Sequence, residues 1–277
     1  MGWQEYIIQP TMIESDRKDT TMRYGLIGEK LGHSYSKLIH EKIAEYTYDL
    51  IPLSKEEFIP FMEQKDFTAI NVTIPYKQSV IPYLDELDPL AREIGAVNTI
   101  VQRDGRYIGY NTDFFGFRYM LEYNSIKIAG RKCLILGSGG TSHTVRSVLN
   151  HLGASQVLVV SRQSTKDTIS YEECQKSHRD AQVIINTTPL GMYPKTEASP
   201  LDLVPFTQCA AVVDAIFNPL ETRLTRQAKE MGMKGVTGLM MLVAQAKQAI
   251  EYFLGQELED SVIEETYHYL LQSLKDQ

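Results

Sequence analysis

The chain has 277 residues, enough for two ordinary domains that each bury a core of their own. With 43% hydrophobic and 23% charged residues, its composition is that of a globular protein and argues against a disordered chain. The formal net charge of −7 argues against nucleic acid as the main partner, because phosphate binding needs local Lys and Arg, but it still allows a basic pocket for a small anion.

Cysteine usage and hydropathy predict a cytoplasmic protein with no metal site and no membrane segment. Cys133, Cys174 and Cys209 are far apart, lack metal-ligand spacing and are expected to be reduced structural residues. The richest apolar run, residues 239–246, is too short to span a membrane. Residues 1–21 lack the apolar core of a signal peptide and are expected to form a leader before the fold.

Short β-rich runs alternate with helical stretches from Arg23 onward, which indicates βαβ units and a mostly parallel sheet. The expected strands cover residues 24–28, 48–53 and 69–73, and the expected helices cover residues 36–46, 55–64 and 113–123. Residues 95–110 are typical of two short strands around the turn Arg103–Gly105.

A second α/β pattern begins at Lys132 and ends in helices. Its expected strands cover residues 132–136, 157–160, 183–185 and 211–216, and its expected helices run to Leu152 and over residues 239–253 and 258–274. We therefore predict an α/β protein of two domains. Residues 1–112 and 238–277 form the first, and residues 113–237 form a nucleotide-binding domain, so that the C-terminal helices return to the first domain.

A glycine-rich segment, Gly137-Ser-Gly-Gly-Thr-Ser142, connects the first strand of the second pattern to a helix. Gly137 permits a tight turn, and Gly139 lets a pyrophosphate approach the backbone at the positive end of the helix. The third glycine follows at once as Gly140, unlike the common G-x-G-x-x-G spacing, so a simple glycine-rich connecting loop is the alternative.

The next strand ends at Ser161-Arg162, where NAD enzymes typically place an acid for the ribose hydroxyls. A cation and a small hydroxyl at this point suit a 2′-phosphate and favour NADP. The alternative is that Arg162 is an ordinary solvated loop residue.

Four loops of the first pattern carry small polar groups at strand ends, where α/β sheets hold their ligands. They are residues 33–36 (His-Ser-Tyr-Ser), 71–77 (Asn-Val-Thr-Ile-Pro-Tyr-Lys), 95–99 (Gly-Ala-Val-Asn-Thr) and 109–113 (Gly-Tyr-Asn-Thr-Asp). Ser34, Asn111 and Asp113 are alternatively helix caps, and Lys77 taken singly is alternatively a solvated surface residue.

Together these groups fit the reduction of a ketone that carries hydroxyls and a carboxylate. A Lys ammonium near the ketone oxygen stabilises the negative charge that develops there and supplies the proton. A neighbouring Asp holds the Lys in place and binds an adjacent hydroxyl.

The ordered set of motifs resembles the shikimate dehydrogenase family over nearly the whole chain from Met22. The matching segments are His-Ser-x-Ser, Asn-Val-Thr-Ile-Pro-Tyr-Lys, Gly-Ala-Val-Asn-Thr, Asn-Thr-Asp, the Gly-x-Gly-Gly loop and Met-Leu-Val-Ala-Gln at residues 241–245. Each is short, but their combined order is highly specific. The resemblance implies an N-terminal α/β substrate domain, a Rossmann-like NADP-binding domain, and NADPH-dependent reduction of 3-dehydroshikimate to shikimate, a step towards chorismate and the aromatic amino acids.

The resemblance also implies the site residues. Lys77 and Asp113 would form the catalytic pair. Both would also contact the substrate, together with Ser34, Ser36, Thr73, Asn98, Phe217 and Gln245. The cofactor would be bound by Gly137, Ser138, Gly139, Gly140, Thr141, Ser161, Arg162 and the backbone of Ala215 and Gly238. The expected partners are the small-molecule substrate and NADP, with a monomer or homodimer as the assembly.

The chain departs from the family pattern at several positions. The usual Asn-Pro before His-Ser is replaced at residues 29–30, and the Pro after the second Ser is Lys37. The usual Asn-Arg-Thr reads Ser-Arg-Gln at 161–163, the usual substrate-facing Tyr is Phe217, and Met240 replaces a small Gly. None of these changes affects the catalytic pair, so they bear on substrate preference more than on activity.

Three other interpretations remain open. A quinate/shikimate dehydrogenase with relaxed substrate or cofactor use is the nearest, although no acid stands at position 161 or 162. A catalytically silent ligand-binding relative is the second, against which the intact Lys77 and Asp113 argue. The third is a structural α/β protein without a small-molecule site.

Overall fold

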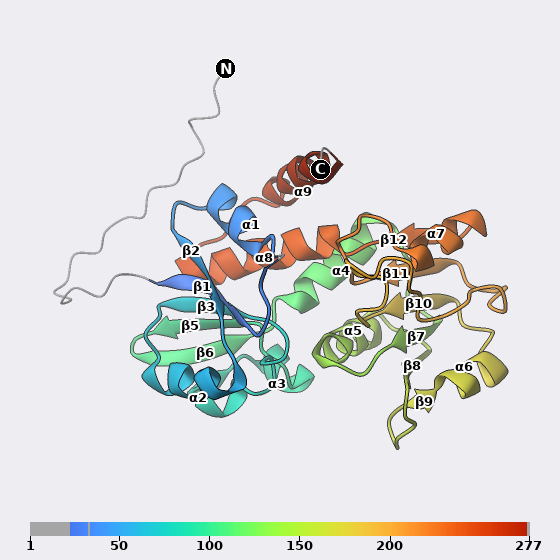
Figure 1. Cartoon of the computed structure of the whole chain (residues 1–277), viewed down its shortest axis with the longest axis horizontal. Helices are drawn as coiled ribbons and strands as arrows, with labels where there is room; N and C mark the ends of the chain where they lie inside the picture. Colours follow the sequence, from blue (N-terminus) through green and yellow to red (C-terminus); the bar gives the residue numbers. More distant parts are fainter. Residues whose placement is uncertain (1–22, 33, 276–277) are drawn as a thin grey trace. The chain divides into compact units, whose positions relative to one another are not determined.

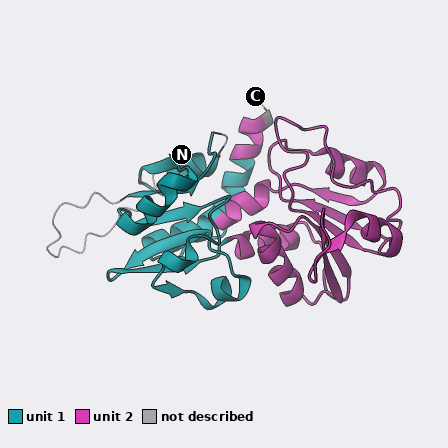
Figure 2. Cartoon of the chain, turned by 60° about the horizontal axis from the view of Figure 1, so that its bottom comes forward, with its two compact units in different colours: residues 1–112, 246–269 teal, residues 113–245, 270–277 magenta. Residues whose placement is uncertain are grey.

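The computed structural model describes residues 23–32 and 34–275 (Figure 1). Two compact units divide the chain, Met1–Thr112 with Ala246–Tyr269, and Asp113–Gln245 with Leu270–Gln277 (Figure 2). The expected leader 1–21, His33 and the last two residues of the chain lie outside the described residues. The chain leaves the first unit after Thr112 and re-enters it inside a helix, at Ala246. The assignment of the two units as substrate and nucleotide domains stays a prediction.

The first unit contains a mixed six-stranded sheet in the order β2-β1-β3-β5-β6-β4. Its strands are β1 (Tyr24–Gly28), β2 (Tyr48–Pro52), β3 (Ala69–Val72), β4 (Glu86–Leu87), β5 (Thr99–Arg103) and β6 (Arg106–Tyr110). β1 is parallel to β2 and β3, whereas β5 is antiparallel to both β3 and β6, so the sheet is less parallel than expected. The hairpin at residues 104–105 makes β5 antiparallel to β6, and the segment that connects β3 to β5 begins and ends at the same edge of the sheet, which makes β5 antiparallel to β3.

The helices of the first unit differ in how they begin, and side-chain caps are present at α2 and α3 but not at α1. They are α1 (Ser36–Ile43), α2 (Lys55–Gln64), the 3-10 helix η2 (Ile81–Tyr83), α3 (Pro89–Ile94) and parts of α8 (Leu239–Leu254) and α9 (Ser261–Lys275). α2 starts at a capping box, in which Ser54 Oγ accepts from Glu57 N and the Glu57 carboxylate accepts from Ser54 N over 2.8 Å. α3 ends at Gly95, whose φ of 71° favours glycine.

Apolar side chains cover both faces of this sheet, as the alternation along each strand requires. Ile27, Ile70 and Ile100 are buried with Phe58 and Met62 of α2. The neighbouring strand residues Leu26, Ala69 and Val101 are buried with Phe253 of α8. The sheet is therefore the middle layer of a three-layer unit, between α2 and α8 (Figure 1).

The second unit contains a wholly parallel sheet in the order β12-β11-β10-β7-β8-β9. Its strands are β7 (Lys132–Leu136), β8 (Gln156–Ser161), β9 (Ile169–Ser170), β10 (Val183–Asn186), β11 (Ala211–Asp214) and β12 (Lys234–Val236). Its helices are α4 (Asp113–Tyr123), α5 (Gly140–His151), α6 (Tyr171–Ser177) and α7 (Arg223–Glu230), with parts of α8 and α9. Counted from β7, this order is 6-5-4-1-2-3, the arrangement of dinucleotide-binding folds, which confirms the expected Rossmann-like sheet.

The core of the second unit is also formed by apolar strand residues packed against a helix. Leu134, Ile184 and Val212 from three adjacent strands are buried with Leu224 and Ala228 of α7. Strand β7 is buried along its last four residues, as a parallel strand with helices on both faces must be. Among the described residues, no helix combines the length and apolar character needed to cross a bilayer, and no cluster of His, Cys, Asp and Glu is suited to hold a metal ion.

Candidate active site

Four polar segments of the first unit meet at one edge of its sheet. Residues 29–32 with 34–36, and residues 73–77, follow the parallel strands β1 and β3, so both segments leave the sheet at its carboxyl edge. Strand β5 runs the opposite way, which places Asn98, just before it, at the same edge, and the hairpin returns residues 111–112 there. The structure thus brings the expected substrate loops of this unit together.

A buried hydrogen-bond network fixes the centre of this edge. Asn71 Oδ1 accepts from the Tyr48 hydroxyl over 2.7 Å, and its amide nitrogen donates to Thr99 Oγ1 over 3.0 Å. Asn98 Oδ1 accepts from the backbone N of Thr112 over 2.7 Å, and its amide nitrogen donates to Thr112 Oγ1 over 3.0 Å. Because Thr112 precedes Asp113, this network holds both Asn98 and the backbone from which Asp113 extends.

The turn after β3 anchors Lys77. The backbone N of Thr73 donates to Ile27 O over 2.9 Å, and the peptide bond between Ile74 and Pro75 is cis. Tyr76 is buried, and its hydroxyl donates to Leu53 O over 2.7 Å. Lys77 O accepts from Val97 N over 2.8 Å, which joins the lysine to the residue before Asn98 while its side chain stays half-buried.

Ser34 and Ser36 lie at the start of α1. Ser34 Oγ accepts from the backbone N of Ser36 over 3.3 Å, but the N-cap position of α1 is Tyr35 and no side chain caps the helix, so the structure does not make Ser34 the helix cap. Ser36 is buried, with 9% of its surface exposed. A Cβ on Gly28, at the end of β1, would lie 2.5 Å from Thr73 Cγ2, which shows how closely the segments after β1 and β3 pack.

The glycine turn of the second unit occupies the switch point of its sheet, between β7 and β10. Gly137 has a φ of 102°, a conformation that favours glycine, and a Cβ there would lie 2.9 Å from Thr188 Cγ2. Gly139 differs, because its φ of −82° suits any residue and a Cβ there would meet no atom of the chain within 4 Å. The fold itself does not require glycine at position 139, whereas a pyrophosphate against the backbone does.

The remaining expected cofactor residues continue from this turn. Helix α5 begins at Gly140 with no side-chain cap, so its first N–H groups suit an anion. Ser138 Oγ lies 3.5 Å from Ser161 Oγ, which links the turn to the end of β8. Arg162 follows at once and is exposed. Because β7 and β8 are parallel, Arg162 and the glycine turn both follow strands at the same carboxyl edge of the sheet.

Ala215 and Gly238 are also neighbours. A Cβ on Gly238 would lie 2.3 Å from Ala215 O, and Gly238 N donates to Ile216 O over 2.8 Å. Before them, Asp214 ends β11 and is fully buried. Burial raises the pKa of the Asp214 carboxyl to about 6, although hydrogen bonds from Ile216, Asn186 and Thr222 act in the opposite direction.

Asp113 and Gln245 lie on helices that pack closely in the second unit. Asp113 begins α4, and both it and Gln245 are buried. One turn later, a Cβ on Gly116 would lie 2.6 Å from Met241 O and 2.8 Å from Gln245 Cβ. Only glycine allows α4 and α8 to come this close, which sets the position of Gln245 relative to α4.

Sequence reasoning named Asn71 and Thr112 only as members of matching segments and gave no role to Asn186, Asp214 or Gly116, which also support this site. All of them except Gly116 are buried polar groups at or next to strand ends. A polar residue that closes an apolar strand was the available signal, because such a group must find a partner once buried. The site residues fall in both units, with Ser34, Ser36, Thr73, Lys77 and Asn98 in the first and the others in the second.

Comparisons with known proteins agree with this architecture. Residues 26–100 match the family model of the shikimate dehydrogenase substrate binding domain. A shikimate dehydrogenase (NADP(+)) of Clostridium perfringens is 37% identical over 265 residues, which cover 89% of this chain and 97% of the relative.

Two solved structures extend the match. A chorismate mutase/shikimate 5-dehydrogenase fusion protein of Clostridium acetobutylicum is 38% identical with a TM-score of 0.84, covering 92% of this chain and 99% of that one. A shikimate 5-dehydrogenase of Thermus thermophilus, solved with NADP(H) and shikimate, is 30% identical with a TM-score of 0.79, covering 90% and 99%. On this identity and coverage, the chain belongs to the shikimate dehydrogenase family.

Proposed function

We propose that this chain is an NADP-dependent shikimate dehydrogenase, which reduces 3-dehydroshikimate to shikimate and catalyses the reverse reaction. One observation carries the proposal. The loops that resemble the family's substrate segments converge at one edge of the first sheet, around the buried network of Asn71, Asn98 and Thr112. The similarity to a curated shikimate dehydrogenase over 89% of the chain supports the same substrate.

The proposed chemistry needs a proton donor and a carboxylate. Bound NADPH supplies a hydride to the ketone carbon. Lys77 stabilises the negative charge that develops on the ketone oxygen and donates the proton to it. Asp113 accepts a hydrogen bond from the neighbouring substrate hydroxyl and holds the Lys77 side chain in place.

Uncharged polar side chains bind the remaining hydroxyls and the carboxylate of the substrate in this proposal. Shikimate offers three hydroxyls and one carboxylate, which hydroxyl and amide side chains bind without bringing excess charge into the site. We assign this role to Ser34, Ser36, Thr73, Asn98 and Gln245. The Asn98 amide is already oriented by Thr112, so little conformational entropy remains to be lost when the substrate binds.

The second unit provides the cofactor side of the proposal. The wholly parallel sheet, the glycine turn at its switch point and the uncapped start of α5 fit a pyrophosphate. Arg162, exposed at the end of β8, is the group that we assign to the 2′-phosphate. This assignment makes NADP the preferred cofactor.

A quinate/shikimate dehydrogenase is the second candidate, and Phe217 in place of the usual Tyr is the observation that favours it. The deciding experiment is a panel of initial rates with shikimate and quinate, each with NAD and NADP, on the full-length chain. We expect the highest kcat/KM for shikimate with NADP. A higher value for quinate contradicts the proposed substrate, and absence of turnover in all four reactions supports a silent relative.

We place the reaction in the cytoplasm as part of the same proposal. Cys133, Cys174 and Cys209 are buried free cysteines, and burial raises the pKa of their thiols to about 12, 11 and 11. Buried, protonated thiols persist in a reducing compartment and have no structural role as disulfides. The expectation of a monomer or homodimer remains a prediction.

A further inference from the structure

Asp214 connects the ends of two central strands of the second unit. It lies opposite Asn186 in the register of β10 and β11, and both residues are fully buried. Its Oδ1 accepts from Asn186 Nδ2 and from the backbone N of Ile216, each over 3.0 Å. Its Oδ2 accepts from the Thr222 hydroxyl over 2.8 Å. One carboxylate thus satisfies three buried donors from three segments.

The connection through Asn186 reaches the glycine turn. Asn186 Oδ1 accepts from the backbone N of Thr188 over 2.9 Å and from its hydroxyl over 2.7 Å. The methyl group of Thr188 is the nearest neighbour of a Cβ built on Gly137. Asp214 holds the Asn186 amide in one orientation. Asn186 in turn fixes the Thr188 side chain, which packs against the glycine turn at Gly137.

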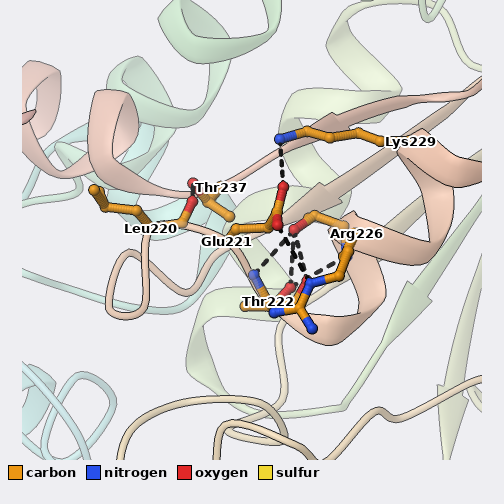
Figure 3. A network of polar contacts seen from close by, with 7 residues as sticks. Leu220, Glu221, Thr222, Arg226, Lys229 and Thr237 are labelled. Atoms are coloured by element: carbon orange, nitrogen blue, oxygen red, sulfur yellow. Dashed lines mark hydrogen bonds and ion pairs between the residues drawn. The ribbon is translucent and has the colours of Figure 1, made fainter. Parts of the chain in front are cut away.

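The connections through Ile216 and Thr222 reach the other cofactor segment. Ile216 O accepts from Gly238 N, and Thr237 Oγ1 donates to Leu220 O over 2.9 Å. Thr222 caps α7, and beside it Glu221 pairs with Lys229 over 2.8 Å and with Arg226 over 3.3 Å (Figure 3). Hydrogen bonds from Asp214 therefore hold segment 215–222 at Ile216 and at Thr222, and hydrogen bonds to Ile216 and Leu220 hold segment 237–238 against it.

We propose that Asp214 is a positioning residue for the cofactor, which acts through its three hydrogen bonds and not through its charge. It holds the segments after β10 and β11 in the arrangement that receives the dinucleotide. The inference rests on the proposed function, because that function assigns Gly137, Ala215 and Gly238 to NADP. Asp214 itself touches neither cofactor nor substrate in this account.

The test is the Kd of NADPH, measured by its fluorescence on the full-length chain without substrate. Asp214→Ala removes the acceptor that three buried donors share, and we expect Kd to rise about tenfold or more. Asp214→Asn keeps Oδ1 for the two N–H donors, and its new amide faces Thr222 Oγ1, which can accept as well as donate. We therefore expect the Kd of NADPH for Asp214→Asn to stay within about twofold of the value for the parent chain.

The control separates positioning from a general loss of stability. Leu203→Ala creates a cavity in the core of the same unit, where Leu203 is fully buried, and should lower Tm without changing Kd. If Asp214→Ala lowers Tm but leaves Kd unchanged, the residue is merely structural and the inference is wrong. If Asp214→Asn weakens binding as much as Asp214→Ala, the charge acts and the hydrogen-bond account is overturned.

A second variant covers the case in which Asp214→Ala does not fold. Thr188→Val keeps the shape at Gly137 and removes the hydroxyl that donates to Asn186 Oδ1 and accepts from Leu190 N over 3.3 Å, at a half-buried position. We expect Kd to rise about threefold or more, and Thr188→Ser, which keeps the hydroxyl, to stay closer to the parent. An unchanged Kd in Thr188→Val overturns the inference. Because the readout is binding, this pattern holds independently of whether shikimate is oxidised, and loss of turnover with intact NADPH binding contradicts the proposed reaction alone.

Discussion

Gly116 and Gln245 bring α4 and α8 into backbone contact, since a Cβ on Gly116 would lie 2.8 Å from the Cβ of Gln245. Any side chain at position 116 would place its Cβ within 3.0 Å of atoms of α8, so one of the two helices would have to move. Asp113 stands one turn before Gly116, so the same contact sets the spacing between two residues that we assign to the substrate.

Gly116→Ala should therefore separate the two helices. We expect a loss of roughly 1–3 kcal/mol in the free energy of unfolding, typical of overpacking, despite the better helix propensity of Ala. The KM for shikimate should rise, since Gln245 moves with α8. Urea unfolding and initial rates measure the two effects. Arg118→Ala, which removes only an exposed pair with Glu122 on the same helix, is the control and should change neither.

Lys77→Ala should lower kcat by roughly a hundredfold or more, the usual contribution of a positioned proton donor. The KM for NADP should change little, because Lys77 lies in the first unit and the residues that we assign to NADP lie in the second. Steady-state rates at saturating NADP are the measurement, and Lys55→Ala, an exposed lysine of α2, is the control. A change confined to the KM for shikimate would reduce Lys77 to a binding residue.

Arg162→Asp should reverse the charge at the proposed 2′-phosphate contact. A charge-assisted hydrogen bond contributes about 1.5–3 kcal/mol, so the KM for NADP should rise roughly tenfold or more, and that for NAD far less. The ratio of the two kcat/KM values is the readout. Arg179→Asp applies the same charge change to an exposed arginine of the same unit and should leave the ratio unchanged. Equal effects on both cofactors would place Arg162 away from the phosphate.

Phe217→Tyr should restore the hydroxyl that the family pattern places near the substrate carboxylate. Phe217 is half-buried, so the ring can keep its packing, and a new hydrogen bond to a charged group contributes about 1.5–3 kcal/mol where water does not already provide it. We expect the KM for shikimate to fall several-fold while kcat changes less. The KM for NADP is the internal control, and an unchanged KM for shikimate would show that the carboxylate is already satisfied.

His40 should make the first unit sensitive to acid. The imidazole is fully buried, stacks on Tyr48 with ring centroids 4.0 Å apart, and lies 2.7 Å from the Tyr46 hydroxyl through Nδ1. Burial lowers the pKa of His40 from 6.5 to about 3. Between these two values the unfolded chain binds a proton that the folded chain does not, so the stability present above pH 6.5 is lost as the pH falls.

The loss should be on the order of 3 kcal/mol between pH 7 and pH 4.5. His40→Phe keeps the aromatic stacking and should flatten this part of the pH profile of urea unfolding, whatever its effect on stability at pH 7. His143→Phe, at an exposed position of α5, should leave the profile unchanged. The same slope in His40→Phe and the parent chain would assign the acid sensitivity to other groups.

Elements with strong local signals were predicted from the sequence with their observed bounds. The helix at residues 55–64 and the strand at residues 132–136 are examples. Ser54 and Glu57 form a capping box within four residues, and an uninterrupted apolar run encodes a buried parallel strand. The short helices α3, α6 and α7 were not predicted, because 6 to 8 residues present too few turns for a clear apolar period.

Motif order in the sequence was enough to identify the family and to single out the glycine turn and the loops that we assign to the cofactor and the substrate. The tertiary structure decided what no local window contains. It made β5 antiparallel, which places Asn98 beside the loops after β1 and β3, and it paired Asn186 with Asp214 and Gly116 with Gln245. These partners are 28 and 129 residues apart in the chain, so their contact depends on how whole elements pack. A buried carboxylate or a helix glycine has a definite role only once that packing supplies its partner.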